Sequence, residues 1–346
     1  MDDSTRWDEI VKSFSNADVY YLSGYVKAFK IHGDGEPILY YYQDENIRAI
    51  NVVMKRDIAE DKKFSESIPK DHFFDISTPY GYGGFIIEGE PNSSSLDALN
   101  KQYIQINQEN NIISEFVRFH PGINNAEYLE HMYDTSKLGS TVTMNLDSPE
   151  QIWNDIASKN RNVIRKAKKS GVEIYWGRSS DLVTDFIPLY NQTMKHDEAS
   201  SYYYFNEDFY NSILNDLKYN SMFFYAEYDN KIISIAIILF DNKSMHYHLS
   251  ASDFNFRHLA ATNLLLNEVA NWGSINGFST FHLGGGLGSK EDSLFSFKKK
   301  FNKNSNTTFS IGKKIFDEDI YNQLLNYRSG SEDLDNESSY FPKYRA

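Results

Sequence analysis

One segment near the C-terminal end has residue types suited to stabilising negative charge. Phe297-Lys298-Lys299-Lys300-Phe301 places two aromatic residues four positions apart on an expected helix, with three lysines around them. A lysine flanked by core-facing aromatics can be drawn into a partly dry environment, where its charge acts more strongly on a developing oxyanion or a phosphate. Alternatively, lysines near a helix C-terminus only complement the helix dipole. Spacing alone leaves both interpretations open.

A glycine-rich loop precedes that segment. Residues 284–288 read Gly-Gly-Gly-Leu-Gly, and Ser289 with Asp292 three positions later resembles a capping box that opens a helix. Glycines let the backbone approach an anion closely, and a helix start presents free N–H groups. The Gly-Lys-Ser/Thr ending of a Walker A motif is missing. The loop is therefore either an anion site or an ordinary turn.

Basic residues gather on an expected helix that runs from Pro149 to Lys169. Arg161, Arg165 and Lys168 share one face of it, so these cations could converge on one anion. A solvated charged face is the alternative interpretation.

Other chemistries find less support. His246 and His248 share one face of an expected strand, but no third ligand at metal-site spacing accompanies them, and we predict no metal. The sequence has no cysteine and no Gly-x-Ser-x-Gly motif, which excludes a cysteine nucleophile and disfavours a serine hydrolase. The aromatic run from Tyr202 to Phe205 fits a pocket wall or a core.

Periodicity predicts two α/β units. Residues 222–252 indicate a three-strand antiparallel meander, followed by a helix over 258–276 and a strand over 278–283. In the first half, 37–43 and 47–55 indicate a hairpin, with a strand at 73–77, a helix over 96–110 and a strand over 112–119. We expect an α/β (α+β) fold with domains 1–147 and 148–330, and a mobile acidic tail 331–346.

Composition limits cellular location and partners. The 346 residues carry a net charge of −13, which disfavours non-specific coating of nucleic acid. The acidic N-terminus is unlike a signal peptide, and the longest apolar run, 232–240, is too short to cross a bilayer. We therefore expect a cytoplasmic protein without a transmembrane segment.

Taken in order, several segments resemble the Fem-type, or peptidoglycan interpeptide-bridge, branch of the GNAT-like acyltransferases. These segments are 78–84 (TPYGYGG), 118–121 (RFHP), 159–167 (KNRNVIRKA) with Gly171-Val172, 247–252 (YHLSAS), 281–286 (FHLGGG) and 292–301 (DSLFSFKKKF).

The resemblance implies two tandem GNAT-like domains, each a mixed, largely antiparallel sheet flanked by helices. It also implies transfer of an aminoacyl or acyl group to an amine of a nucleotide- or lipid-linked cell-envelope precursor, such as a peptidoglycan precursor. The co-substrate would be aminoacyl-tRNA or acyl-CoA, and no cofactor would be tightly bound. A local basic patch could hold tRNA, and transient contact with a membrane surface is compatible with this chemistry.

The resemblance also implies residue roles. Lys298 would stabilise the oxyanion or the leaving group. The substrate-binding positions would be Arg161, Arg165, Tyr80, Tyr82, Gly83, Tyr203, His248, Gly285 and Gly286.

Two departures from the family leave the donor open. The long helical arm of tRNA-dependent members is missing, and Arg257-His258-Leu259-Ala260-Ala261-Thr262 replaces the glycine loop of acetyl-CoA enzymes. The alternatives are therefore an acetyl-CoA-dependent N-acetyltransferase of amino sugars in capsule or exopolysaccharide synthesis, and a non-catalytic module that binds a nucleotide sugar or a partner.

Overall fold

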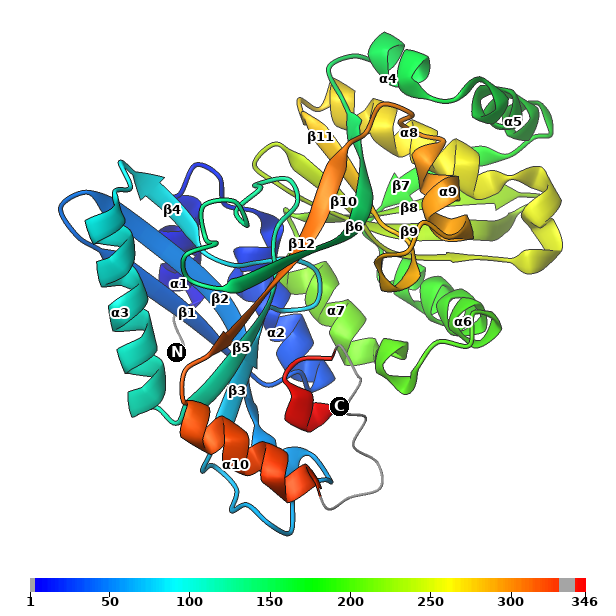
Figure 1. Cartoon of the computed structure of the whole chain (residues 1–346). Coiled ribbons are helices and arrows are strands. Elements are labelled where there is room, and N and C mark those ends of the chain that lie inside the picture. Colours follow the sequence, from blue (N-terminus) through cyan, green and yellow to red (C-terminus); the bar gives the residue numbers. More distant parts are fainter. Residues whose placement is uncertain (1–3, 330–339) are drawn as a thin grey trace. The chain divides into compact units, whose positions relative to one another are not determined.

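The structure is a computed structural model that describes residues 4–329 and 340–346, and the chain forms two compact units (Figure 1). Unit 1 comprises Met1–Leu138 and Phe309–Ala346, and unit 2 comprises Gly139–Thr308. The chain enters unit 2 within strand β6 (Asp134–Asn145) and leaves it within β12 (Thr307–Ile315). The expected boundary at residue 147 is therefore wrong. The polar residues Asp147 and Ser148 lie at the start of a helix within unit 2, where Ser148 Oγ accepts from the backbone N–H of Gln151.

Unit 1 is built on a mixed sheet. Its strands are β1 (Glu36–Gln43), β2 (Ile47–Asp57), β3 (Phe74–Ser77), β4 (Ile86–Gly89), β5 (Ile112–Arg118) and β12. The order is β1-β2-β3-β5-β12, and β4 also pairs with β2. The pair β3/β5 is parallel, whereas β1/β2, β2/β3, β2/β4 and β5/β12 are antiparallel. The predicted hairpin is confirmed, and Asp44 Oδ1 closes its turn by accepting from Asn46 and Ile47 N–H.

The helices of unit 1 cover this sheet. They are α1 (Ser4–Lys12), α2 (Ser23–His32), α3 (Ser93–Glu109) and α10 (Glu318–Ser329). Asn92 caps α3 by accepting from Ser95 N–H, and the helix buries Leu99 and Tyr103 against Phe85 and Phe119. Removal of such large apolar and aromatic side chains from water is the main favourable term in folding.

The C-terminal residues of unit 1 are packed rather than mobile. Residues 331–339 of the expected tail lie outside the described part of the chain, but Tyr344 is fully buried, and Arg345 Nε lies 2.5 Å from Asp75 Oδ2. Arg56 Nε lies 2.7 Å from the other carboxylate oxygen. Burial alone would raise the pKa of Asp75, but the two guanidinium groups more than offset this and hold it below its ordinary value. The C-terminal segment is therefore part of the unit 1 fold.

Unit 2 contains the predicted meander. Its strands are β6, β7 (Glu173–Gly177), β8 (Ser221–Tyr228), β9 (Lys231–Asp241), β10 (Ser244–Ser252) and β11 (Thr280–Gly284), in the order β6-β11-β10-β9-β8-β7. The pair β10/β11 is parallel, and β7/β8, β8/β9, β9/β10 and β6/β11 are antiparallel. Asp229 and Asn230, and Asn242 in the next turn, adopt positive φ in the two hairpin turns, as asparagine and aspartate tolerate.

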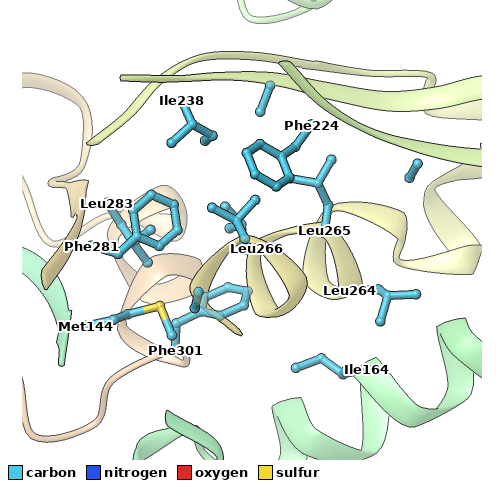
Figure 2. Packing of buried hydrophobic residues seen from close by; sticks show 14 of the residues in the cluster. Met144, Ile164, Phe224, Ile238, Leu264, Leu265, Leu266, Phe281, Leu283 and Phe301 are labelled. Carbon is cyan, nitrogen blue, oxygen red and sulfur yellow. The ribbon is translucent and has the colours of Figure 1, made fainter. Parts of the chain in front are cut away.

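Helices pack on both faces of the unit 2 sheet. They are α4 (Pro149–Asp155), α5 (Ser158–Lys169), α6 (Asp181–His196), α7 (Glu207–Asp216), α8 (Ala261–Ile275) and α9 (Ser293–Lys299). Neighbouring side chains on β8 show the two faces, because Phe223 contacts Phe186 of α6 and Phe224 contacts Trp272 of α8. Figure 2 shows the core on the α8 side, where Leu265 lies next to Phe224 and Leu266 points toward Phe281 and Leu283.

Two helix predictions need correction. The expected helix from Pro149 to Lys169 is broken at Ile156 and Ala157, which have extended ψ angles of 131° and 138°. The expected helix over 258–276 begins at Ala261, since a 3-10 turn, Phe254–Leu259, ends at Ala260 in the left-handed region. No helix formed by the described residues is both long and apolar enough to cross a membrane.

Candidate functional site

Strands β10 and β11 separate part-way along their length. They pair over Ser244–His246 and Thr280–His282, and no later pairs join them. Beyond that point β10 has a register shift between Tyr247 and Leu249 against β9 and continues to Ser252, while β11 ends at Gly284. A bulge bends a strand and re-aims its groups. The backbone of the second half of β10 on this side is therefore not engaged by β11 and can pair with an extended ligand.

Lys298 belongs to α9, and its ammonium group lies beside the glycines that end and follow β11. Its side chain is only 9% exposed, and Nζ donates to the carbonyl oxygen of Gly285 at 2.7 Å. Burial lowers the pKa of Lys298 to about 8, partly opposed by the negative charge of Asp292. The structure thus brings together two sequence-predicted site residues, Lys298 and Gly285, and places an ammonium group with a readily lost proton beside the glycine loop.

The glycine loop has tight steric requirements. A Cβ at Gly286 would lie 2.1 Å from the carbonyl oxygen of Lys290 and 2.3 Å from Asp292 Oδ1. Asp292 accepts from Leu287 N–H at 2.9 Å and from Phe295 N–H at 2.8 Å, so it closes the loop and caps α9. The expected capping box at Ser289 is wrong, because the cap is Asp292 itself.

Arg161 and Arg165 lie on α5, and both guanidinium groups contact Trp153 of α4. Arg161 Nη1 donates to the carbonyl oxygens of Trp153 and Ile156, each at 3.1 Å, where α4 ends. Arg165 lies over the ring of Trp153 at 5.0 Å and donates to Asn162 Oδ1 at 3.0 Å. Arg161 therefore satisfies carbonyls of the broken helix, and an anion would have to compete with these bonds.

His248 lies at the bulge of β10. Burial lowers its pKa to about 3, with a further contribution from His246, so His248 is neutral at pH 7. Tyr203 ends the 3-10 turn Ser201–Tyr203, and its ring meets that of Tyr202 edge to face at 5.4 Å. Both residues belong to unit 2.

Tyr80, Tyr82 and Gly83 lie together in unit 1, in the loop that follows β3. Arg118 fastens this loop with bonds to the carbonyl oxygens of Gly81, Thr78 and Pro79 at 3.1–3.2 Å. A Cβ at Gly83 would lie 2.8 Å from Thr78 Cγ2, so only glycine fits without a shift.

Aromatic rings surround the two tyrosines. The ring of Tyr82 lies 5.7 Å from Tyr20 and 5.8 Å from His120, and Tyr80 stacks on Phe29 at 5.5 Å. Burial raises the pKa of Tyr82, so its hydroxyl stays protonated.

Two groups of polar side chains form contacts that the sequence did not predict. His120 Nε2 lies 3.3 Å from Asp18 Oδ2, while His120 Nδ1 accepts from Gly122 and Ile123 N–H at 3.1 and 3.2 Å. In unit 2, Thr143 Oγ1 lies 2.9 Å from His282 Nδ1 and accepts from Thr307 Oγ1 at 3.0 Å. The partners lie 102 and 139 positions apart, so no local pattern points to them.

Comparison with known proteins agrees with the observed fold. Residues 157–293 match the family model for an acetyltransferase (GNAT) domain. The matched residues lie within unit 2. No curated protein matches the chain.

Solved structures resemble the whole chain at low identity. FemX is 15% identical with a TM-score of 0.66, covering 92% of this chain and 98% of FemX. A protein of unknown function from Bacteroides thetaiotaomicron is 11% identical with a TM-score of 0.58, covering 90% and 97%. L-PGS from Bacillus licheniformis is 13% identical with a TM-score of 0.50, covering 87% and 90%. These likenesses and the observed sheets confirm the expected α+β class of mixed, largely antiparallel sheets flanked by helices.

Proposed function

We propose that this GNAT domain transfers an acyl group from an activated donor to a primary amine of a cell-envelope precursor, with a peptidoglycan precursor as the first candidate. One observation carries the proposal: the buried ammonium of Lys298 lies beside the Gly285 carbonyl where β10 and β11 separate. A positive charge held away from water at a strand opening is suited to a reaction that develops negative charge on a bound carbonyl.

The chemistry demands orientation and charge stabilisation. The amine nitrogen attacks the carbonyl carbon of the ester or thioester, and the carbonyl oxygen becomes an oxyanion. The C–N bond then forms fully as the C–O or C–S bond to the leaving group breaks. The amine loses its proton to water or to a phosphate of the substrate. Because Lys298 is mostly protonated at neutral pH, it can donate to the oxyanion or supply the leaving group with a proton.

The remaining site residues are assigned to binding. In unit 2, the backbone of Gly285 and Gly286 would line the path of the reacting carbonyl, with His248 and Tyr203 on neighbouring walls. Arg165 is exposed and makes one side-chain hydrogen bond, so it is better placed than Arg161 to bind a substrate phosphate. In unit 1, the loop with Tyr80, Tyr82 and Gly83 is assigned to the acceptor, since Arg118 holds it in one shape.

Two donors fit this chemistry. The Fem-type motifs and the likeness of the whole chain to FemX favour aminoacyl-tRNA. One observation favours acyl-CoA as the donor: Ala260 has a positive φ of 53° directly before α8, and the small side chains of Ala260 and Ala261 lie at the start of this helix. Helix starts attract phosphate groups.

The experiment separates the donors. Purified protein is incubated either with acetyl-CoA or with a mixture of aminoacyl-tRNAs, together with nucleotide-linked amino sugars and muropeptides, and acceptor masses are measured. An added amino-acid mass with the tRNA mixture alone supports the Fem-type function, and an added acetyl mass with acetyl-CoA alone supports sugar N-acetylation. Binding of a nucleotide-linked precursor without any mass change under either donor would replace the proposal by a non-catalytic binding module.

A further inference from the structure

The exposed face of α5 carries charge of one sign. Ser158–Lys169 contains six cationic side chains and no acidic one, although the whole chain has a net charge of −13. The apolar side of the helix, with Ile164 and Ala167, is buried in the unit 2 core. The helix therefore concentrates positive charge on the surface of an acidic protein.

Four of these cations are available to a partner. Lys159, Lys166, Lys168 and Lys169 are exposed, and among the described residues none of their side chains forms an ion pair or a hydrogen bond. A solvated lysine gives up no protein contact when it binds an anion. We call these four residues the lysine row.

An exposed tryptophan lies on the same side of the sheet. Trp176 of β7 is 53% exposed, and its ring lies 6.0 Å from Phe224. Phe224 belongs to the core that α5 and α8 cover, so Trp176 and α5 occupy the same face. Tryptophan is enriched where proteins meet the headgroup region of a membrane, because its ring is apolar and its N–H is polar.

We propose that the lysine row and Trp176 form a peripheral contact with an anionic phospholipid surface. The lysine ammonium groups approach the headgroup phosphates, and the indole of Trp176 enters the interface. Because the apolar side of α5 is already buried, the helix itself does not insert, and the attraction depends on charge.

The surroundings of the row favour a membrane over a folded RNA. The ten steps from Lys159 to Lys169 make the row about 15 Å long at 1.5 Å per residue. Lys168 shares a surface groove of about 460 Å³ with Glu173 and Glu268. These carboxylates would repel a second line of phosphates, whereas a planar lipid surface meets only the lysines on the solvent side of α5.

Vesicle sedimentation of the full chain tests the proposal. The vesicles contain phosphatidylcholine alone or with about one third phosphatidylglycerol, and we expect binding to the second kind that weakens as salt rises. Lys→Gln at all four positions of the row should lower the partition coefficient at least about a hundredfold. The matched control is Lys→Gln at Lys12, Lys62, Lys70 and Lys101, exposed residues of unit 1 that give the same net charge.

Each outcome bears on the proposal. Binding that neither variant changes, or that both reduce equally, overturns it. If the row variant loses retention of a tRNA mixture on a filter but keeps its vesicle binding, the row is an RNA site and the proposal is wrong. Tryptophan emission should shift to the blue on the anionic vesicles, and Trp176→Phe should remove the shift; an unchanged shift would exclude Trp176 from the contact.

Discussion

The Nζ atom of Lys298 lies 2.7 Å from the carbonyl oxygen of Gly285, and the Cβ position of Gly284 would lie 3.3 Å from the same nitrogen. Helix α9 and the end of β11 thus hold a charged group against a stretch of backbone that has no side chains. Because these glycines have no side chains, they do not block the ammonium group from the backbone side. Burial lowers its pKa and so sets the pH at which it loses its charge.

Lys298→Met should lower kcat about a hundredfold or more, because it removes the proposed donor to the oxyanion while keeping most of the buried volume. Acyl transfer to the acceptor identified by mass spectrometry is the measurement, with circular dichroism to check folding. Lys300→Met is the control, since Lys300 is exposed and should stay near the parent rate. Full activity in a folded Lys298→Met protein would remove Lys298 from the mechanism.

The pH dependence follows from the lowered pKa of Lys298. The protonated ammonium is present below about pH 8 and is lost above it, so the rate should fall as pH rises through this value. Lys298→Arg keeps its charge at alkaline pH and should move the fall to higher pH, even if its rate is lower. A profile that does not decline between about pH 7 and about pH 9.5 would contradict a protonated role.

Gly286→Ala should destabilise unit 2 by about 2 kcal/mol and reduce transfer, because the new methyl group overlaps the carbonyl of Lys290 and Asp292. Urea unfolding followed by tryptophan fluorescence measures the change. Gly177→Ala provides the comparison, since its Cβ would stand 3.6 Å from Leu182 Cδ1 and should change stability by less than about 0.5 kcal/mol. Equal effects of the two substitutions would show that the loop accommodates a methyl group at position 286 without strain.

Arg345→Met should cost about 3 kcal/mol of stability, because it leaves the buried carboxylate of Asp75 with Arg56 as its remaining cation. Unfolding in urea at neutral pH is again the measurement. Lys343→Met removes an exposed cation two positions earlier and should be nearly neutral. If the two variants unfold at the same urea concentration, the C-terminal contact contributes nothing to unit 1.

Local patterns predicted much of the fold. The meander over 222–252 and the first hairpin were predictable because their strands are rich in β-branched and aromatic residues and their turns contain Asp-Asn-Lys or Asp-Glu-Asn. The break between α4 and α5 was not, because neither Gly nor Pro marks Ile156 and Ala157. Likewise, Arg345 and Asp75 are 270 positions apart in the sequence, and no pattern near either residue predicts their contact.

The candidate site was predictable in part. Lys298 and Gly285 fall within the segments quoted for the resemblance, and the structure places them in contact. The hydrogen bonds of Arg161 were not predictable, because helical spacing describes one helix, whereas its guanidinium donates to carbonyl oxygens at the end of another. The roles of the tyrosines, His248 and both arginines stay predictions until turnover is measured.

The path of the chain through the two units has a consequence for synthesis on the ribosome. Residues 139–308 are complete before residues 309–346 exist, yet unit 1 needs β12 to pair with β5 and Arg345 to neutralise Asp75. Unit 2 can therefore fold while unit 1 still lacks β12, so the nascent N-terminal segment keeps an unpaired strand edge until residues 309–346 have been synthesised.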